Sequence, residues 1–316
     1  MTAGTEQPPS LTETEIATQP HCWQRAADEA DGFGQALPQR GERVAVSGCG
    51  TSWFMAQAYA ALREASGQGE TDAFAASEFP AARAESYDRV VVITRSGTTT
   101  EVLDLLGALR NRTRTVALTA DPAGRVLRAA DRVAVLDHAD EESVVQTRFA
   151  TTALAFLRAG LEQHGSLPVK SVAEAAADAE NAVAVPLPAG AAVAEQWTFL
   201  GSGWTYGLAL EAALKMREAA GAWTEAYPSM EYRHGPIAIA APRRVVWQFG
   251  ALPEGLAEDI AGTGAELVAA SRDAERVPDP MADLIRAQRL AVEVARARGC
   301  DPDRPRNLTR SVVLDG

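Results

Sequence analysis

Residues 43–53, RVAVSGCGTSW, begin with a short apolar run and continue into a Gly-X-Gly turn. The run Arg43–Ser47 is typical of a short buried strand, and the apolar pattern of Trp53–Ala65 behind the turn is typical of a helix. A second unit of the same kind follows, with a strand at Arg89–Thr94 and a helix at Glu101–Arg110. Strands that alternate with helices predict a parallel sheet with helices on both faces.

This alternation continues along the chain, and part of it repeats. Further strands are predicted at Arg114–Leu118, Arg132–Leu136, Trp197–Gly201, Arg244–Phe249 and Ala265–Ala270, and further helices at Gln24–Ala36, Ala123–Ala129, Thr147–His164, Gly207–Gly221 and Met281–Arg298. FLGSGWTY at 199–206 resembles VSGCGTSW at 46–53, since both contain a strand, a Gly-X-Gly turn and the start of a helix. We therefore predict an α/β fold with two related three-layer lobes, each with a flavodoxin-like parallel sheet.

Composition shifts suggest where the lobes meet. Residues 166–190 contain three prolines around an Ala-rich helix and are predicted to link a first domain, 19–165, to a second, 191–316. The polar residues 1–18 are predicted to be disordered. The tail, 301–316, contains two prolines and is predicted to be extended.

Charge and cysteine content exclude several classes of protein. The formal net charge is −12 and the pI is near 4.9, so the chain should repel nucleic-acid backbones. No apolar run is long enough for a membrane span, and the N-terminus does not resemble a signal peptide. Three scattered cysteines argue against a disulfide framework or a zinc site and suit a reducing cytoplasm. We expect a cytoplasmic protein without a metal.

Two loops that follow predicted strands are rich in hydroxyl side chains. Ser47–Ser52 reads SGCGTS and Thr94–Thr100 reads TRSGTTT. Hydroxyls, the Arg95 guanidinium and the free amides of a helix N-terminus are donors that suit a phosphate monoester. Neither loop matches a P-loop or the dinucleotide Gly-X-Gly-X-X-Gly pattern. Two such loops favour a sugar-phosphate site over the structural alternative, a helix capping box made by Thr98 and Glu101.

Several further motifs accompany the loops. They are CGTS at 49–52, SGTTTE at 96–101, VVQTRFATT at 144–152, LEAALKMRE at 210–218, TEAY at 224–227, EYRHGPIAI at 231–239 and DPDRPRNLTRSV at 301–312. In this combination the chain resembles the double sugar-isomerase (SIS) family, which includes the isomerase half of glucosamine-6-phosphate synthase and hexosamine-6-phosphate deaminases. The resemblance extends from about residue 20 over nearly the whole chain.

The resemblance implies roles for particular residues. The phosphate would be bound by Ser52, Thr94, Arg95, Ser96 and Thr99, and the substrate would be lined by Gly50, Thr51, Val144, Gln146 and Arg310. Glu218, which ends the LEAALKMRE motif, would move the proton. His234, in the His-Gly-Pro motif, would assist ring opening from the neighbouring subunit. A homodimer with shared active sites is therefore implied, with a small sugar phosphate as ligand and no cofactor.

The chain departs from the family pattern in two respects. It has no N-terminal glutaminase domain and no Cys directly after Met1, so we do not expect it to take ammonia from glutamine. In the tail, Arg310 stands where the family commonly has a lysine that contacts the substrate. A guanidinium stays protonated and cannot form an imine with a keto sugar, so chemistry that needs that lysine is not expected.

Glu211, Lys215 and Glu218 are spaced i, i+4 and i+7 and therefore share one face of the predicted helix. Taken alone, this pattern also fits a solvated stripe of ordinary ion pairs. The residues between them are mostly small or apolar, and together with the resemblance they favour a partly buried carboxylate at Glu218, with Lys215 beside it as part of the catalytic group. Such a carboxylate suits removal of the weakly acidic C2 proton of an open-chain aldose.

Removal of the C2 proton allows three outcomes. Reprotonation at C1 gives a ketose, an amine at C2 allows an imine to hydrolyse with release of ammonia, and loss of the C3 hydroxyl gives an unsaturated sugar. We expect isomerisation with deamination of a hexosamine 6-phosphate, and dehydration of an N-acetylhexosamine 6-phosphate as the alternative. A phosphosugar sensor without catalysis is the alternative from another class, although residues 1–40 do not resemble a DNA-binding domain.

Overall fold

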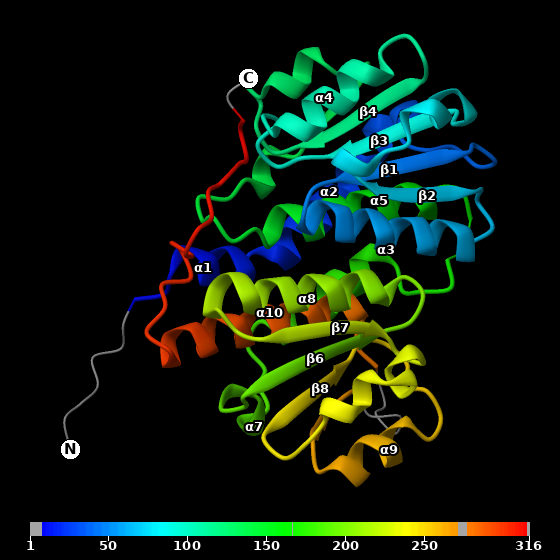
Figure 1. Cartoon of the computed structure of the whole chain (residues 1–316). Helices are drawn as coiled ribbons and strands as arrows, with labels where there is room; N and C mark the ends of the chain where they lie inside the picture. Colours follow the sequence, from blue (N-terminus) through cyan, green and yellow to red (C-terminus); the bar gives the residue numbers. More distant parts are fainter. Residues whose placement is uncertain (1–7, 166, 271–276, 315–316) are drawn as a thin grey trace.

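The computed structural model describes residues 8–165, 167–270 and 277–314. Two parallel β-sheets lie one above the other, with helices between them and on their outer faces (Figure 1). Among the described residues, the first sheet consists of β1 (Val44–Gly48), β2 (Thr71–Ala75), β3 (Arg89–Ile93), β4 (Arg114–Thr119) and β5 (Arg132–Val135). Its strand order, β2-β1-β3-β4-β5, is that of flavodoxin-like sheets, which agrees with the predicted class of sheet.

The second sheet repeats the order of the first four strands. In the described part of the chain it consists of β6 (Gln196–Gly201), β7 (Thr224–Pro228), β8 (Arg244–Gln248) and β9 (Glu266–Val268), in the order β7-β6-β8-β9. Every neighbouring pair in this sheet is parallel. The predicted α/β class with two parallel-sheet lobes is confirmed.

The strands β2 and β7 were not predicted. Each lies at the edge of its sheet, beside the first strand of its lobe, and most of its residues are only half-buried. Their sequences, TDAFA and TEAYP, lack the β-branched run that marks the buried strands. An edge strand is held by backbone hydrogen bonds to one neighbour, so its side chains carry a weak signal.

The helices between the sheets form one continuous core. The longer helices are α2 (Gln19–Phe33), α3 (Thr51–Ala65), α4 (Thr100–Leu109), α5 (Arg148–Glu162), α6 (Val172–Ala182), α8 (Thr205–Ala220) and α10 (Pro280–Ala297), and the shorter ones are α1 (Leu11–Ala17), α7 (Ala189–Ala192) and α9 (Leu256–Thr263). Apolar faces of α2, α3, α5, α6, α8 and α10 meet in a single cluster with both sheets. The helix α4 covers the outer face of the first sheet, and α9 covers that of the second.

The first helix corrects the expectation of disorder for residues 8–18, whereas residues 1–7 lie outside the described ranges. Residues 11–17 form α1, and Ser10 and Glu13 make a capping box at its start. Asp303 in the C-terminal tail accepts hydrogen bonds from the first two backbone amides of this helix, each at 2.8 Å. The helix is therefore held by a residue from the far end of the chain, which its local composition does not reveal.

Two helix boundaries also differ from prediction. The helix α2 begins at Gln19 rather than Gln24, with Pro20 in its first turn. The helix predicted at 123–129 is limited to a 3-10 turn at Arg125–Arg128.

The predicted linker is a packed part of the molecule. Residues 166–190 contain the expected Ala-rich helix, α6, which packs against α2 and α10. Because one core reaches both sheets, the assignment of 19–165 and 191–316 to separate domains stays a prediction.

A close crossing of α3 and α8 positions the first loop. A Cβ at Gly207 of α8 would lie 2.5 Å from the backbone oxygen of Phe54 and 2.9 Å from Cβ of Ala58, both on α3. Only glycine allows this approach without displacement of the helix. The crossing brings the N-terminus of α3 next to α8, so that Lys215 Nζ donates a hydrogen bond to Thr51 Oγ1 at 3.0 Å.

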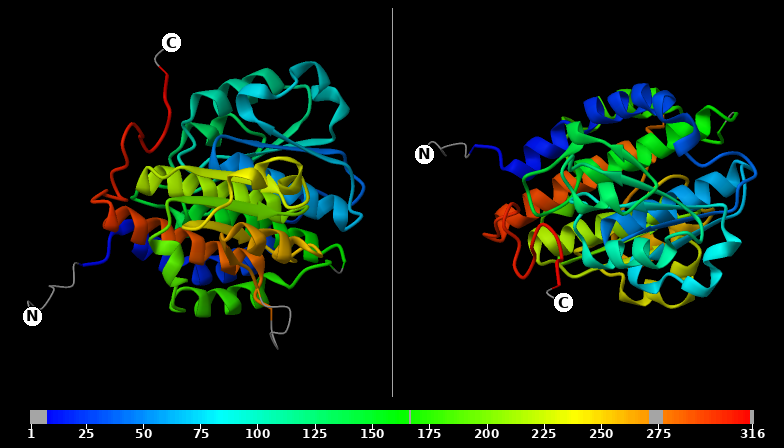
Figure 2. Two further views of the ribbon diagram at one scale, coloured as in Figure 1. Left: turned by 60° about the horizontal axis from the view of Figure 1, so that its bottom comes forward. Right: turned by 90° about the horizontal axis from the view of Figure 1, so that it is seen from above.

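The C-terminal tail connects the two lobes. It leaves α10 and passes α1 and α8 on its way to α4 in the first lobe (Figure 1, Figure 2). The amide of Thr100 donates to the Val312 carbonyl at 3.2 Å, and the amide of Leu314 donates to Thr100 Oγ1 at 2.9 Å. The described part of the tail, 301–314, contains turns at 302–303 and 306–307 and forms neither helix nor strand. Of the helices in the described ranges, none has the length and apolar composition that crossing a bilayer requires.

Candidate active site

The two hydroxyl-rich loops lie side by side, because they follow β1 and β3, which are neighbours in the first sheet. A cavity of about 210 Å³ lies between them, at the edge where open parallel sheets commonly bind ligands. Its lining includes Gly50, Thr51, Ser52, Thr94, Arg95, Ser96, Thr99, Val144, Gln146, Glu218 and Arg310. All of the predicted site residues except His234 and Lys215 therefore meet in one cavity.

The second loop takes its shape from Gly97 and not from a helix cap. Gly97 has a positive φ of 62°, and a Cβ there would lie 2.8 Å from Val126 Cγ1. Within residues 93–109, all of which the structure describes, α4 begins without a side-chain capping bond. The capping box considered for Thr98 and Glu101 is therefore absent, and the structural alternative for this loop does not apply.

Three buried polar atoms of residues that line the cavity have no hydrogen-bond partner among the described residues. They are Thr94 Oγ1, Arg95 Nε and Gln146 Nε2. A buried polar atom without a partner costs about 1–3 kcal/mol, so native proteins seldom leave one unpaired. Their position suggests that a bound molecule supplies the missing hydrogen bonds.

Arg95 is bonded mainly to the backbone around the cavity. Its Nη1 donates to the Ser143 carbonyl at 3.0 Å, and its Nη2 donates to the Arg310 carbonyl at 2.8 Å. Burial lowers the pKa of Arg95, although the Glu141 carboxylate acts in the opposite direction. Arg95 thus holds the segment with Val144 and the tail against the second loop, and direct binding of a phosphate by its guanidinium stays a prediction.

The tail closes the cavity with a residue that the sequence analysis did not single out. Ser311 Oγ lies 3.0 Å from Ser96 Oγ, 3.1 Å from Thr98 Oγ1 and 3.4 Å from Thr99 Oγ1. The only hint in the sequence is its place in the NLTRSV motif, directly after Arg310.

Arg310 is held away from the centre of the cavity. Its Nη2 lies 2.5 Å from Asp140 Oδ1, and its Nε donates to the Glu141 carbonyl at 3.1 Å. The guanidinium therefore anchors the tail to the segment before α5.

A buried cluster of charges lies behind one wall of the cavity and reaches it through Glu218. Lys215 Nζ makes an ion pair with Glu218 Oε2 and lies 3.6 Å from Glu211 Oε1. Glu211 and Lys215 are buried, whereas the Glu218 side chain is 18% exposed and lines the cavity. The predicted shared face is confirmed, and the solvated stripe is excluded.

One ammonium group faces two carboxyl groups in this cluster. Burial raises the pKa of Glu211 to about 8, although Lys215 acts in the opposite direction. Burial by itself would lower the pKa of Lys215, but the Glu211 and Glu218 carboxylates outweigh it and raise that pKa. Near neutral pH, a protonated Glu211 leaves the Lys215 charge to Glu218, the carboxylate that reaches the cavity.

The sequence is similar to glutamine–fructose-6-phosphate aminotransferases (isomerizing). It is 30% identical over 317 residues to the protein from Xanthomonas campestris, covering 87% of this chain and 52% of that one. It is 26% identical over 322 residues to the protein from Chlorobaculum tepidum, covering 88% and 52%. The chain thus spans about half the length of the curated relatives it matches. No protein-family model matches it.

Solved structures share the fold over nearly the whole chain. Glucosamine-6-phosphate deaminase from Thermotoga maritima matches with a TM-score of 0.78 at 24% identity, over 96% of this chain and 100% of that one. Tagatose-6-phosphate ketose/aldose isomerase from Escherichia coli matches with a TM-score of 0.73 at 18% identity, over 96% of both chains. The resemblance to the double sugar-isomerase family is thus confirmed in sequence and in fold.

Two of the predicted site residues do not line the cavity. Lys215 is covered, with Thr51 and Glu218 as its partners. His234 ends a 3-10 turn in the second lobe, is exposed and is not part of the lining. A role for His234 therefore depends on a second subunit, and the homodimer stays a prediction.

Glu211 is the residue whose importance the sequence did not reveal. Its spacing places it on the face with Lys215, but nothing in the spacing shows that its carboxyl group is fully buried. Burial follows from the packing of α8 against α3, which is a tertiary contact.

The raised pKa of Glu211 predicts a pH dependence of the stability of this chain. The folded protein retains a proton that the unfolded chain releases above about pH 4.5, so the free energy of unfolding should fall as pH rises from about 4.5 to 8. The slope attributable to this group is at most about 1.4 kcal/mol per pH unit. Glu211→Gln should remove it, as measured by urea denaturation at several pH values.

The matched control for this prediction is Glu258→Gln, which changes an exposed glutamate in α9 and should leave the slope unchanged. An identical pH profile for Glu211→Gln and the wild type would contradict the assignment.

Proposed function

We propose that this chain is an enzyme that binds a hexosamine 6-phosphate and removes the proton at C2 with Glu218. One observation carries the proposal: a single cavity connects the hydroxyl groups of the two loops with the ion pair of Glu218 and Lys215. A ligand that fills it has its anionic end at the loops and its reacting carbons near Glu218. The names of the relatives described above, which refer to hexose and hexosamine 6-phosphates, support the same substrate class.

In this proposal the phosphate is bound by hydroxyl groups and helix amides. Ser52, Ser96 and Thr99 donate to its oxygens, and Thr94 gains the hydrogen-bond partner that it lacks. The amides at the N-termini of α3 and α4 add partial positive charge. Phosphate binding replaces the hydrogen bonds that Ser311 now makes with the second loop.

The proposed reaction is a proton transfer followed by hydrolysis. In the open-chain aldose, Glu218 takes the C2 proton, and the electron pair forms the C1–C2 double bond as the aldehyde becomes an enolate. A proton from water neutralises the enolate oxygen, which gives an enaminol. Return of the C2 proton to C1, with the nitrogen lone pair forming the C=N bond, then leaves a protonated imine at C2. Water adds to that imine, and the C–N bond breaks with release of ammonia and a ketose 6-phosphate. Lys215 orients the Glu218 carboxylate, and His234 of a second subunit assists ring opening.

Dehydration of an N-acetylhexosamine 6-phosphate is the second candidate. It is favoured because neither the lysines nor Arg310 offers a free amine that could form an imine with the sugar. The sequence has two lysines, Lys170 and Lys215, and each pairs with a carboxylate. Arg310 is bonded to Asp140 and cannot form an imine. An acylated nitrogen does not leave as ammonia, so loss of the C3 hydroxyl becomes the outcome of C2 proton removal.

The test is incubation with glucosamine, N-acetylglucosamine and fructose 6-phosphates in deuterated water. We expect deuterium at C2 of glucosamine 6-phosphate together with release of ammonia, because the phosphate anchors the sugar beside Glu218. Glucosamine without the phosphate is the control and should not exchange. An unsaturated product from the N-acetylated sugar would instead establish dehydration. Binding of all three phosphates without exchange would contradict catalysis and favour the sensor.

A further inference from the structure

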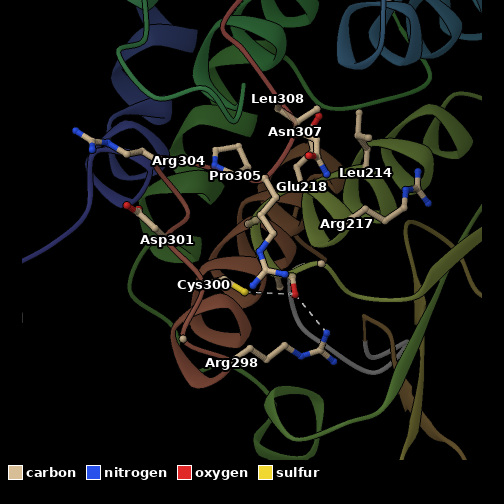
Figure 3. Close-up of a pocket in the computed structure, with 15 residues that line it drawn as sticks. Leu214, Arg217, Glu218, Arg298, Cys300, Asp301, Arg304, Pro305, Asn307 and Leu308 are labelled. Atoms are coloured by element: carbon tan, nitrogen blue, oxygen red, sulfur yellow. Dashed lines mark hydrogen bonds between the residues drawn. The ribbon is translucent and has the colours of Figure 1, made fainter.

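A second and larger cavity lies behind Glu218, on the side away from the phosphate loops. It has a volume of about 670 Å³ and is bounded by the C-terminal ends of α8 and α10 and by the start of the tail (Figure 3). Its lining includes Arg217, Glu218, Arg298, Asp301, Arg304 and Arg306.

The charge of this cavity is opposite to that of the protein. Four arginines line it against two carboxylates, Glu218 and Asp301, and Glu218 is already paired with Lys215. The whole chain has a formal charge of −12. A local excess of guanidinium groups in an acidic protein favours an anionic ligand at this place.

Two of the arginines have a structural explanation. Arg217 donates to the Thr224 carbonyl at 3.3 Å, and Arg298 donates to the Ala220 carbonyl at 3.3 Å and lies over the Trp197 ring. Both belong to the last turns of their helices, where cations offset the helix dipole.

Arg304 and Arg306 have no such explanation. They belong to the tail and are exposed, and their side chains make no hydrogen bond or ion pair within the described residues. In Figure 3 the Arg304 side chain extends from the tail on the side opposite Arg217 and points away from the other labelled residues. Exposed arginine side chains without partners are free to turn toward a ligand.

The two cavities are adjacent at the reacting end of the site. Glu218 and Leu308 line both of them. The smaller, of about 210 Å³, lies below the range of about 300–1,000 Å³ that is usual for small-molecule sites, and the larger lies within it. A simple hexosamine phosphate occupies the smaller cavity and leaves the larger one empty.

We infer that the natural substrate carries a carboxylate-bearing substituent near its reacting carbons, and that Arg304 and Arg306 bind this second anionic group. The inference rests on the proposed function, because it places the sugar with its phosphate at the loops and C2 at Glu218. The substituent then extends past Glu218 into the arginine-lined cavity.

The test compares three ligands that bind without turnover. They are 2-amino-2-deoxyglucitol 6-phosphate, its N-carboxymethyl derivative and the neutral N-carbamoylmethyl derivative, which lack the carbonyl group that makes the C2 proton acidic. Titration calorimetry on the full chain should show that the carboxymethyl compound binds about tenfold more tightly than the carbamoylmethyl compound. In the double variant Arg304→Gln/Arg306→Gln this preference should disappear, while the unsubstituted compound binds as before.

The matched control is Arg40→Gln/Arg128→Gln, which removes two exposed arginines outside both cavities and should keep the preference. Added acetate tests whether the arginines bind a separate small carboxylate instead of an attached one. If acetate strengthens binding of the unsubstituted compound while the carboxymethyl group has no effect, the inference of an attached carboxylate is wrong. Equal affinity of the two derivatives, with normal binding of the unsubstituted compound, would overturn the inference and leave the proposed function standing. Failure of all three compounds to bind would overturn both.

Discussion

Glu218→Gln should lower the rate of C2 deuterium exchange in glucosamine 6-phosphate by about 10²–10⁴-fold, because an amide cannot accept the proton. Binding should persist, since the hydroxyl groups assigned to the phosphate belong to other residues, on the loops after β1 and β3. Exchange is followed by NMR in deuterated water, and binding of the non-reacting 2-amino-2-deoxyglucitol 6-phosphate by titration calorimetry. The two readouts separate a lost base from a lost site.

Glu293→Gln is the matched control, because this glutamate of α10 is exposed and makes no side-chain hydrogen bond or ion pair within the described residues. It should exchange like the wild type. Unchanged exchange in Glu218→Gln would refute Glu218 as the base. Loss of both exchange and binding would show that Glu218 holds the ligand rather than the proton.

The second large effect is expected on stability. Lys215→Met should lower the free energy of unfolding at pH 7 by about 3 kcal/mol, as measured by urea denaturation, because it leaves the Glu218 carboxylate without its counter-ion in a mostly buried place. Glu211 contributes less, since burial raises its pKa to about 8 and a neutral carboxyl group needs no counter-ion. This loss lies at the lower end of the range that is usual when one partner of a buried ion pair is removed, because the Glu218 carboxylate can turn into the cavity.

Lys170→Met is the matched control, because Lys170 is the other lysine of the chain and its side chain is 27% exposed. Its partner Asp178 also accepts the Asp279 amide at 2.8 Å, so the loss should be smaller. Adding Glu218→Gln to Lys215→Met should restore part of the stability, since it removes the unpaired charge. If the double variant is less stable than Lys215→Met alone, the charge explanation is wrong.

Much of the first lobe could be predicted because its signals are local. The strands β1 and β3 are apolar runs that end in glycine- and hydroxyl-rich loops, and each loop leads into a helix. Adjacent parallel strands end at the same edge of the sheet, so the loops had to meet if the strands were neighbours. The spacing of Lys215 and Glu218 likewise suffices to place them on one face of α8, because residues three apart are neighbours on a helix surface.

The remaining features depend on contacts between distant segments. The capping of α1 by Asp303 and the bonds from Ser311 to the second loop join residues that are far apart in the chain. The edge strands β2 and β7 are defined by the neighbours to which their backbones bond. Neither the apolar pattern nor the secondary-structure propensity of a single segment indicates which distant segment it will contact.

The sequence therefore accounts for the α/β class and for the polar groups that the site contains. The apolar patterns of strands and helices and the composition of the loops depend only on residues that are close together in the chain. The tertiary structure accounts for how those groups act together. The crossing at Gly207 buries Glu211, pairs Lys215 with Glu218 and sets them against the first loop. The packing of the tail on both lobes divides the space beside Glu218 into a hydroxyl-lined and an arginine-lined cavity. Burial and the proximity of charges arise only when distant segments pack, and they decide which carboxylate is open to a ligand.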